Sequence, residues 1–117
     1  MRRAHRLRQQ REFAAVYRRG HPFRSDLFVL RALRTKRPLS RVGFTVGKST
    51  GNAVVRNQIK RRLREAVRSL PLAPGWDLVL NVRSGAATAD FQQLRQVLAE
   101  LATRAGVLRD EEGASLG

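Results

Sequence analysis

The residues that point most directly to a chemistry lie in one stretch, GNAVVRNQIKRRLREAVRSL, at positions 51–70. If this stretch is helical, its cationic side chains at three- and four-residue spacing fall on one ridge that covers an arc of about 140°. The cationic ridge consists of Arg56, Asn57, Lys60, Arg61, Arg64 and Arg68. Guanidinium and ammonium groups one helical turn apart can follow the phosphates of a nucleic-acid backbone. The stretch therefore predicts a phosphate-binding helix.

A solvated helix face is the ordinary alternative for a charged run. Such faces mix signs, because Glu and Lys four residues apart stabilise a helix whereas like charges so spaced oppose it. Only Glu65 interrupts the cations here, which favours phosphate binding. The first-turn N–H groups near Lys48 and Asn52 add positive potential where an anion could bind. Arg62 and Val54 do not fit this two-sided pattern.

Other chemistries find little support in the sequence. The chain has no cysteine, which excludes thiol catalysis, disulfides and cysteine zinc sites. His5 and His21 each stand alone in basic surroundings, so neither is expected to act in acid–base catalysis. Asp26, Asp77 and Asp90 lie at predicted element starts, where capping is the ordinary role of a carboxylate. We therefore expect no metal site in the protein and no nuclease activity of the protein alone.

The charge balance points to a polyanionic partner. The chain has 117 residues and a formal net charge of +15, with 21 arginines among its 24 cations. Its last eleven residues hold one arginine against three carboxylates, so residues 1–106 carry +17. Such charge opposes compaction, and nucleic acid is a better candidate partner than an anionic membrane surface. No apolar run approaches a bilayer span and the N-terminus lacks an apolar signal core, so we expect a cytoplasmic protein.

Periodicity predicts three helices and three strands in one domain at 1–106, followed by a flexible acidic tail at 107–117. The helices are expected at 9–19, 53–70 and 89–105, and the strands at 27–34, 41–47 and 76–83. This order, αββαβα, implies an α+β class, a two-layer sandwich of a small sheet with helices packed on it. Residues 21–25 are predicted to be a break, and 35–40 a hairpin loop that makes the first two strands antiparallel.

Local signals define the helix ends and the buried face of the basic helix. Asn52 and Thr88 are predicted N-caps of the second and third helices, and Gly20 and Gly106 follow the first and third. The face expected to meet the sheet consists of Val55, Ile59, Leu63, Ala66, Val67 and Leu70.

Three motifs carry a family resemblance. GNAVVRNQIKRRLREA resembles the arginine-rich helix of the bacterial ribonuclease P protein component. RLRQQREFAAVYRRG and RVGFTVGKSTGNAV resemble two further motifs of the same family, and all three occur in the family's order over about residues 5–104. A ribosomal-type RNA-binding protein without an enzyme role is the alternative, and the ordered motifs argue against it.

The resemblance implies a fold and a division of labour. The fold would be of the ribosomal protein S5 domain 2-like type. It would contain a left-handed βαβ crossover, whereas such crossovers are almost always right-handed. Hydrolysis of the bond that joins the 5′ leader to precursor tRNA would be carried out by a catalytic RNA with Mg²⁺. The protein would bind that RNA and the leader, with no cofactor of its own, no membrane and no obligate protein partner.

The resemblance also implies site residues. Lys48, Asn52 and the cationic ridge would contact RNA. A leader-binding cleft between the first helix and the sheet would be lined by Phe13, Tyr17, Phe28, Arg31, Phe44 and Val46, with Thr45 near it, although Phe13 and Phe44 also suit an ordinary core. Two positions depart from the family pattern. Ser49 and Thr50 replace a second lysine after Lys48, and Arg31 stands where some members carry an aromatic residue.

Overall fold

The computed structural model describes residues 6–109, and every predicted helix and strand is present within two residues of its expected bounds. The elements are α1 (Gln10–Arg19), β1 (His21–Arg24), β2 (Phe28–Arg34), β3 (Arg41–Val46), α2 (Ala53–Arg68), β4 (Trp76–Val82) and α3 (Phe91–Ala105). Short 3-10 turns, η2 (Lys48–Thr50) and η3 (Ser84–Ala87), follow β3 and β4. The mixed α+β class is confirmed.

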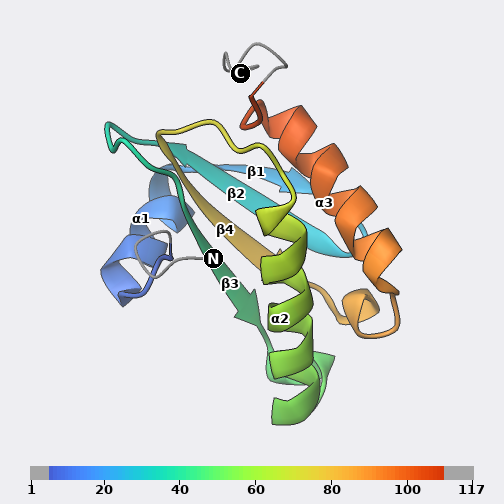
Figure 1. The fold of residues 1–117 in the computed structure, drawn as a ribbon. Helices are drawn as coiled ribbons and strands as arrows, with labels where there is room; N and C mark the ends of the chain where they lie inside the picture. The colour runs from blue at the N-terminus through green and yellow to red at the C-terminus, as the bar shows by residue number, and fades with distance from the viewer. Residues whose placement is uncertain (1–5, 110–117) are drawn as a thin grey trace.

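The strands form one sheet in the order β1-β2-β4-β3, in which only the β3–β4 pair is parallel (Figure 1). The predicted hairpin between β2 and β3 is therefore wrong. β4 lies between them and pairs with both. Its central residues Leu78, Val79 and Leu80 are all buried, as in a strand whose two faces are both covered.

The predicted break at residues 21–25 is also wrong, because residues 21–24 form β1. The Ser25 hydroxyl accepts from the Phe28 N–H at 3.0 Å and turns the chain back into β2. Pro22 is tolerated there because β1 is an edge strand.

α2 is the crossover that joins the parallel strands β3 and β4. In Figure 1 both strands run down the page, α2 lies in front of the sheet, and β4 lies to the right of β3. This arrangement is left-handed, as the resemblance implied.

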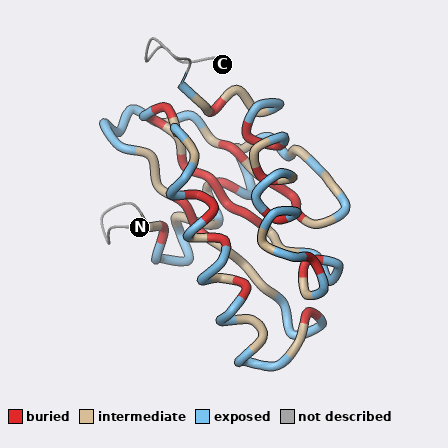
Figure 2. Tube along the Cα trace, turned by 45° about the vertical axis from the view of Figure 1, so that its right-hand side comes forward, coloured by how far each residue is buried: buried red, intermediate tan, exposed pale blue. Residues whose placement is uncertain are grey.

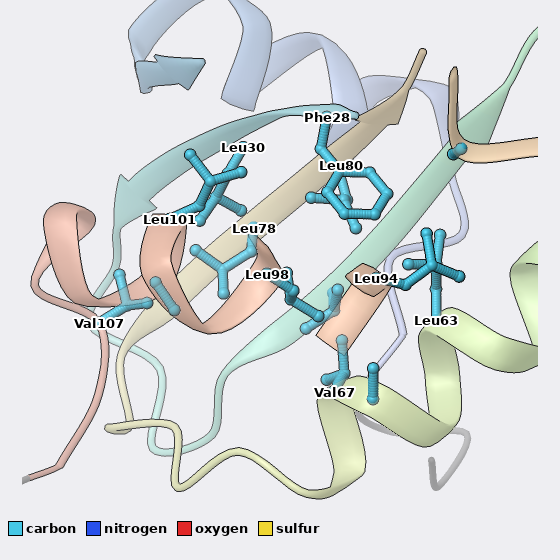
Figure 3. Close-up of a cluster of buried hydrophobic side chains, with 14 of the residues drawn as sticks. Phe28, Leu30, Leu63, Val67, Leu78, Leu80, Leu94, Leu98, Leu101 and Val107 are labelled. Atoms are coloured by element: carbon cyan, nitrogen blue, oxygen red, sulfur yellow. The ribbon is translucent and has the colours of Figure 1, made fainter. Parts of the chain in front are cut away.

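The main core lies between one face of the sheet and the helices α2 and α3. Figure 3 shows Leu30, Leu78 and Leu80 of the sheet meeting Leu63 of α2 and Leu98 of α3. In Figure 2 the buried segments gather in the middle of the molecule, where these layers meet. Four of the six predicted core positions of α2 are buried, namely Ile59, Leu63, Ala66 and Val67, while Val55 and Leu70 are partly buried against the same cluster.

α1 covers part of the opposite face of the sheet and adds a third, partial layer to the predicted two. A second buried cluster forms there from Leu7, Val16 and Val79, with Phe13 packed against it. A Cβ on Gly43 of β3 would lie 2.5 Å from Cζ of Phe13, so the α1 helix can approach the sheet only over a glycine.

An ion network ties α1 to the sheet. Arg41 of β3 donates to both carboxylate oxygens of Asp77 in β4, at 3.0 and 2.7 Å. Its Nη1 donates to Glu12 of α1 at 2.5 Å. Asp77 is therefore a charge partner within the sheet and not a cap.

Three of the four predicted caps are confirmed and one is wrong. Gly20 ends α1, where its N–H donates to the Val16 carbonyl. The Asn52 side chain accepts from the Val55 N–H at 3.0 Å, and Gly106 ends α3 with a left-handed φ of 71°. Asp90, not Thr88, caps α3, because its carboxylate accepts from the Gln93 N–H at 2.8 Å. Thr88 instead donates to the Gly85 carbonyl.

The folded part of the chain extends beyond the predicted boundary at residue 106. Val107 is fully buried in the main core, and Leu108 forms an isolated antiparallel β-bridge with Leu72. The start of the predicted flexible tail was therefore placed too early, and residues 110–117 lie outside the described residues.

The apolar face of α2 gives a first test. Leu63→Ala should lower the free energy of unfolding by about 2–5 kcal/mol, because Leu63 is 0% exposed and the substitution leaves a cavity. Val54→Ala on the same helix should change it by less than about 0.5 kcal/mol, since Val54 is 65% exposed. Urea unfolding of both variants measures this, and equal losses would contradict the orientation of α2.

The ion network gives a second test. Hydrogen bonds from the N–H groups of Gln9 and Arg8, together with the charge of Arg41, lower the pKa of Glu12 from 4.5 to about 2. Glu12 therefore stabilises the fold above about pH 4.5, and this contribution is lost as the pH falls toward about 2.

Glu12→Gln should accordingly be less stable near neutral pH and lose less stability on acidification through that window. Glu65→Gln is the matched control, because the Glu65 side chain is 62% exposed. Urea unfolding at a series of pH values measures both, and an unchanged pH dependence in Glu12→Gln would disprove the tether.

Candidate nucleic-acid interface

The cationic ridge runs along one side of α2, next to the buried face. Asn57, Arg61 and Arg68 are exposed, whereas Arg56, Lys60 and Arg64 are half-buried. Among residues 6–109, the only salt bridge of the ridge joins Arg68 to Glu65 at 3.5 Å, with both side chains 62% exposed. An exposed pair of this kind contributes little, so the ridge keeps almost all of its charge.

The half-buried side of the ridge forms one wall of a groove of about 420 Å³ along the free edge of β3. The opposite wall comes from the segment that precedes α1. The groove is lined by Arg6, Leu7, Arg8, Phe13, Val42, Gly43, Phe44, Lys60 and Arg64. Cations and aromatic rings thus meet in one concave site.

Within residues 6–109, no carboxylate forms a salt bridge with Arg6, Lys60 or Arg64 of this groove. Burial, then the charges of Arg6 and Arg61, lower the pKa of Arg64. The Nε atoms of Arg6 and Arg64 are buried and have no hydrogen-bond partner in the described part of the chain. Two guanidinium groups with unused donors, and no carboxylate of residues 6–109 paired with them, create a site that an anion would stabilise.

A second set of polar side chains lies on the sheet face that α1 partly covers. Asn81 of β4 donates to the Tyr17 hydroxyl and to Oγ1 of Thr45, the latter at 2.5 Å. Its Oδ1 accepts from Nε of Arg31 at 3.1 Å. The Arg31 guanidinium lies over the Tyr17 ring, 4.9 Å from its centroid. We call Tyr17, Arg31, Thr45 and Asn81 the sheet-face cluster.

The structure separates the residues expected to line the leader cleft. Tyr17 and Arg31 lie together in the sheet-face cluster, and Phe13 lies on the same face. Phe28 does not belong to a cleft, because it is 0% exposed in the core under α2 and α3. Phe44 and Val46 pack against that core too, although Phe44 reaches the groove at the β3 edge.

Strand alternation explains this separation. Successive side chains of a strand point to opposite faces, so Thr45 faces the α1 side while Phe44 and Val46 face α2. For the same reason Phe28 shares a face with Leu30 and not with Arg31.

The remaining predicted RNA contacts lie near the start of α2. Lys48 is exposed in η2 and Asn52 is exposed at the N-cap, so both are accessible. The side-chain oxygen of Asn52 is occupied by the Val55 N–H.

Sequence reasoning missed two residues of these sites, Asn81 and Arg6. Asn81 is a polar residue in the otherwise apolar run LVLNV, a signal that could have identified it. Thr45, which the resemblance placed near the cleft, is its register partner on β3. Arg6 reaches the ridge through a bridge to Val42, and no local pattern indicates that contact.

Within the described range 6–109, no group of three His, Cys, Asp or Glu side chains is arranged to hold a metal ion. His21 is exposed, and His5 lies outside the described residues. No helix in this range is long and apolar enough to cross a membrane.

Comparison with known proteins agrees with this geometry. The Ribonuclease P family matches residues 1–106. The ribonuclease P protein component of Roseiflexus castenholzii is 46% identical over 112 residues, which cover 93% of this chain and 92% of that protein. The ribonuclease P protein component of Dehalococcoides mccartyi is 39% identical, over 92% of this chain and 90% of its own length.

Solved structures give the same result. The ribonuclease P protein of Staphylococcus aureus superimposes with a TM-score of 0.83 at 29% identity, over 92% of this chain and all of that one. The protein of Thermotoga maritima gives 0.78 at 30% identity, over 85% and 96% of the two chains.

These matches exclude the alternative of a ribosomal-type protein without an enzyme role. The chain therefore belongs to the ribonuclease P protein family, as a subunit of the endoribonuclease of tRNA 5′ maturation whose RNA carries the catalysis.

Proposed function

We propose that this chain binds the catalytic RNA of ribonuclease P along the cationic ridge and holds the 5′ leader of precursor tRNA against the α1 side of the sheet. The observation that carries the proposal is the pair of arginines Arg6 and Arg64 in the groove, whose buried Nε donors have no partner among residues 6–109.

The ridge suits a folded RNA backbone. Lys60 and Arg64 are held by packing of α2 and of the segment before α1, so few side-chain rotamers need to be ordered on binding. Phosphate contacts of this kind provide position and affinity but no sequence information. A surface that supplies affinity and position without reading sequence suits a subunit that binds one large RNA.

The sheet-face cluster suits a single strand. Tyr17 is 41% exposed, and the guanidinium of Arg31 lies over its ring. Unpaired bases stack on aromatic rings and on guanidinium planes with little dependence on sequence. A leader of variable sequence requires that tolerance.

The proposal assigns no metal to the protein. We propose that the Mg²⁺ of the holoenzyme is held by RNA, that no further protein subunit is required, and that the complex acts in the bacterial cytoplasm where tRNA precursors are made. In support, the carboxylates of residues 6–109 are dispersed over separate elements, and Glu12 and Asp77 are already bound to Arg41.

The ridge is tested by binding of the full chain to ribonuclease P RNA over a salt series. Arg64→Ala should weaken binding about tenfold, because a charge-assisted contact is lost. Arg62→Ala is the matched control, since Arg62 is exposed and lies outside the ridge. With about six phosphate contacts, log affinity should fall with log salt at a slope of about −4 to −5, and Arg64→Ala should make the slope shallower by about 0.7 to 0.9. A flat salt dependence, or an equal loss in Arg62→Ala, would disprove the assignment.

The leader site is tested with the reconstituted holoenzyme, by comparing its affinity for precursor and for mature tRNA. The wild-type holoenzyme should prefer the precursor, and Tyr17→Ala should reduce that preference about fivefold or more, because a stacking surface is lost. Leu39→Ala is the control, since Leu39 is 49% exposed in the β2–β3 loop.

Without RNA, the chain should leave the precursor uncut. Cleavage by protein alone, or no preference for precursor in the wild type, would contradict the proposal.

A further inference from the structure

We infer that Asn81 is a positioning residue of the leader site: it holds Arg31 against Tyr17 so that the guanidinium presents its two terminal nitrogens to one leader nucleotide. This inference rests on the proposed leader-binding role of the sheet-face cluster. It concerns a residue that no motif of the sequence singled out.

Asn81 is the centre of the hydrogen bonds in the cluster. Its Oδ1 accepts from Nε of Arg31 at 3.1 Å, and its amide nitrogen donates to Oγ1 of Thr45 at 2.5 Å and to the Tyr17 hydroxyl. These partners come from β2, β3 and α1, so one side chain joins three elements. Thr45 lies directly beside Asn81 in the parallel β3–β4 register, which fixes the site to the sheet.

This arrangement leaves part of Arg31 unused. Its Nε is bound by Asn81 and one face of its guanidinium lies on Tyr17. Its Nη1 and Nη2 make no hydrogen bond or salt bridge to any residue of the range 6–109. The carboxylate that shares this sheet face, Asp77, is paired with Arg41 instead. Arg31 therefore keeps its charge and two donors for a ligand.

Positioning matters because a free arginine side chain samples many rotamers. An arginine held at Nε and stacked on a ring loses less entropy when it binds, so more of the contact energy appears as affinity. Without Asn81, Arg31 would keep its charge but lose the contact that directs it.

The donor pair selects a ligand chemistry. Two neighbouring N–H groups in one plane match two acceptors about the same distance apart. In a single-stranded leader such a pair is offered by the oxygens of a phosphodiester or by the O6 and N7 atoms of guanine. The shared chemistry is a bidentate acceptor pair, and the two sources can be distinguished by experiment.

The test is a double-substitution cycle in the reconstituted holoenzyme, with the ratio of precursor to mature tRNA affinity as the readout. Asn81→Leu keeps a similar volume and removes all three hydrogen bonds. It should lower the ratio about fivefold, as Arg31→Ala should, because each removes one oriented cationic contact. The double variant should lose no more than either single variant, because both act through the same contact.

Controls separate positioning from folding. Affinity for mature tRNA should stay unchanged in all variants, which reports an intact ridge, and Asn81→Ala provides a second apolar replacement. Losses that add in the double variant, or an unchanged ratio in Asn81→Leu, would overturn the inference. If Tyr17→Ala lowers the ratio while both Asn81 variants leave it unchanged, only this inference fails. If the wild type shows no preference for precursor, the proposed function itself fails.

Two further arms identify the acceptor. If the partner is guanine, replacing one leader guanine by adenine should lower wild-type affinity but not that of Arg31→Ala. If the partner is a phosphate, base changes should have no effect, and Arg31→Ala should make the salt slope shallower by about 0.7. Either result supports a bidentate contact at Arg31. If no base change has an effect at any leader position and the salt slope of Arg31→Ala is also unchanged, the contact is refuted.

Discussion

The whole arrangement depends on how α2 is held against the sheet. Ile59, Leu63, Ala66 and Val67 are buried along one side of the helix, and this fixes its rotation about its own axis. Once the rotation is fixed, the neighbouring side must face the free edge of β3, where Lys60 and Arg64 line the groove. The apolar core therefore determines where the cations point. Because α2 also connects the parallel strands β3 and β4, both of its ends are tied to the sheet by short segments.

The sheet divides the molecule into a closed side and an open side. α2 and α3 cover one face completely enough to bury Phe28 and Leu80. α1 has ten residues and covers the other face only in part, over Val79 and Gly43. Toward the carboxyl ends of β3 and β4 this face carries Thr45 and Asn81, which are polar and half-exposed. Because α1 is short, the polar side chains of Thr45 and Asn81 stay accessible on this face beside the Tyr17 ring.

The sequence predicts the elements and the two-sided character of α2 because both follow from local periodicity. It does not predict the place of β4 between β2 and β3, since strand order is decided by contacts between distant segments. The positions of Phe44 and Val46 could have been predicted, because Val42, Phe44 and Val46 alternate with Arg41, Gly43 and Thr45 and must share a face. They were assigned to the cleft by family resemblance, although the alternation already indicated an ordinary core position for Phe44. The approach of Arg6 to Arg64 has no sequence signal, because it depends on where the segment before α1 crosses the edge of β3.

The few carboxylates of the chain explain why folding and RNA recognition can be separated. Glu12 and Asp77 both bind Arg41, which joins α1 to the sheet, and Asp90 caps α3. Each of these negative charges stabilises the fold at a point away from the cationic ridge. On α2 itself only Glu65 is acidic, and its contact with Arg68 is exposed. The repulsion along the ridge is therefore opposed by apolar burial on the adjacent side of the helix and not by internal ion pairs. Internal pairs would have to be broken before RNA could bind. Among residues 6–109 the only salt bridge of the ridge is the exposed Arg68–Glu65 pair, so the ridge is ready for a polyanion.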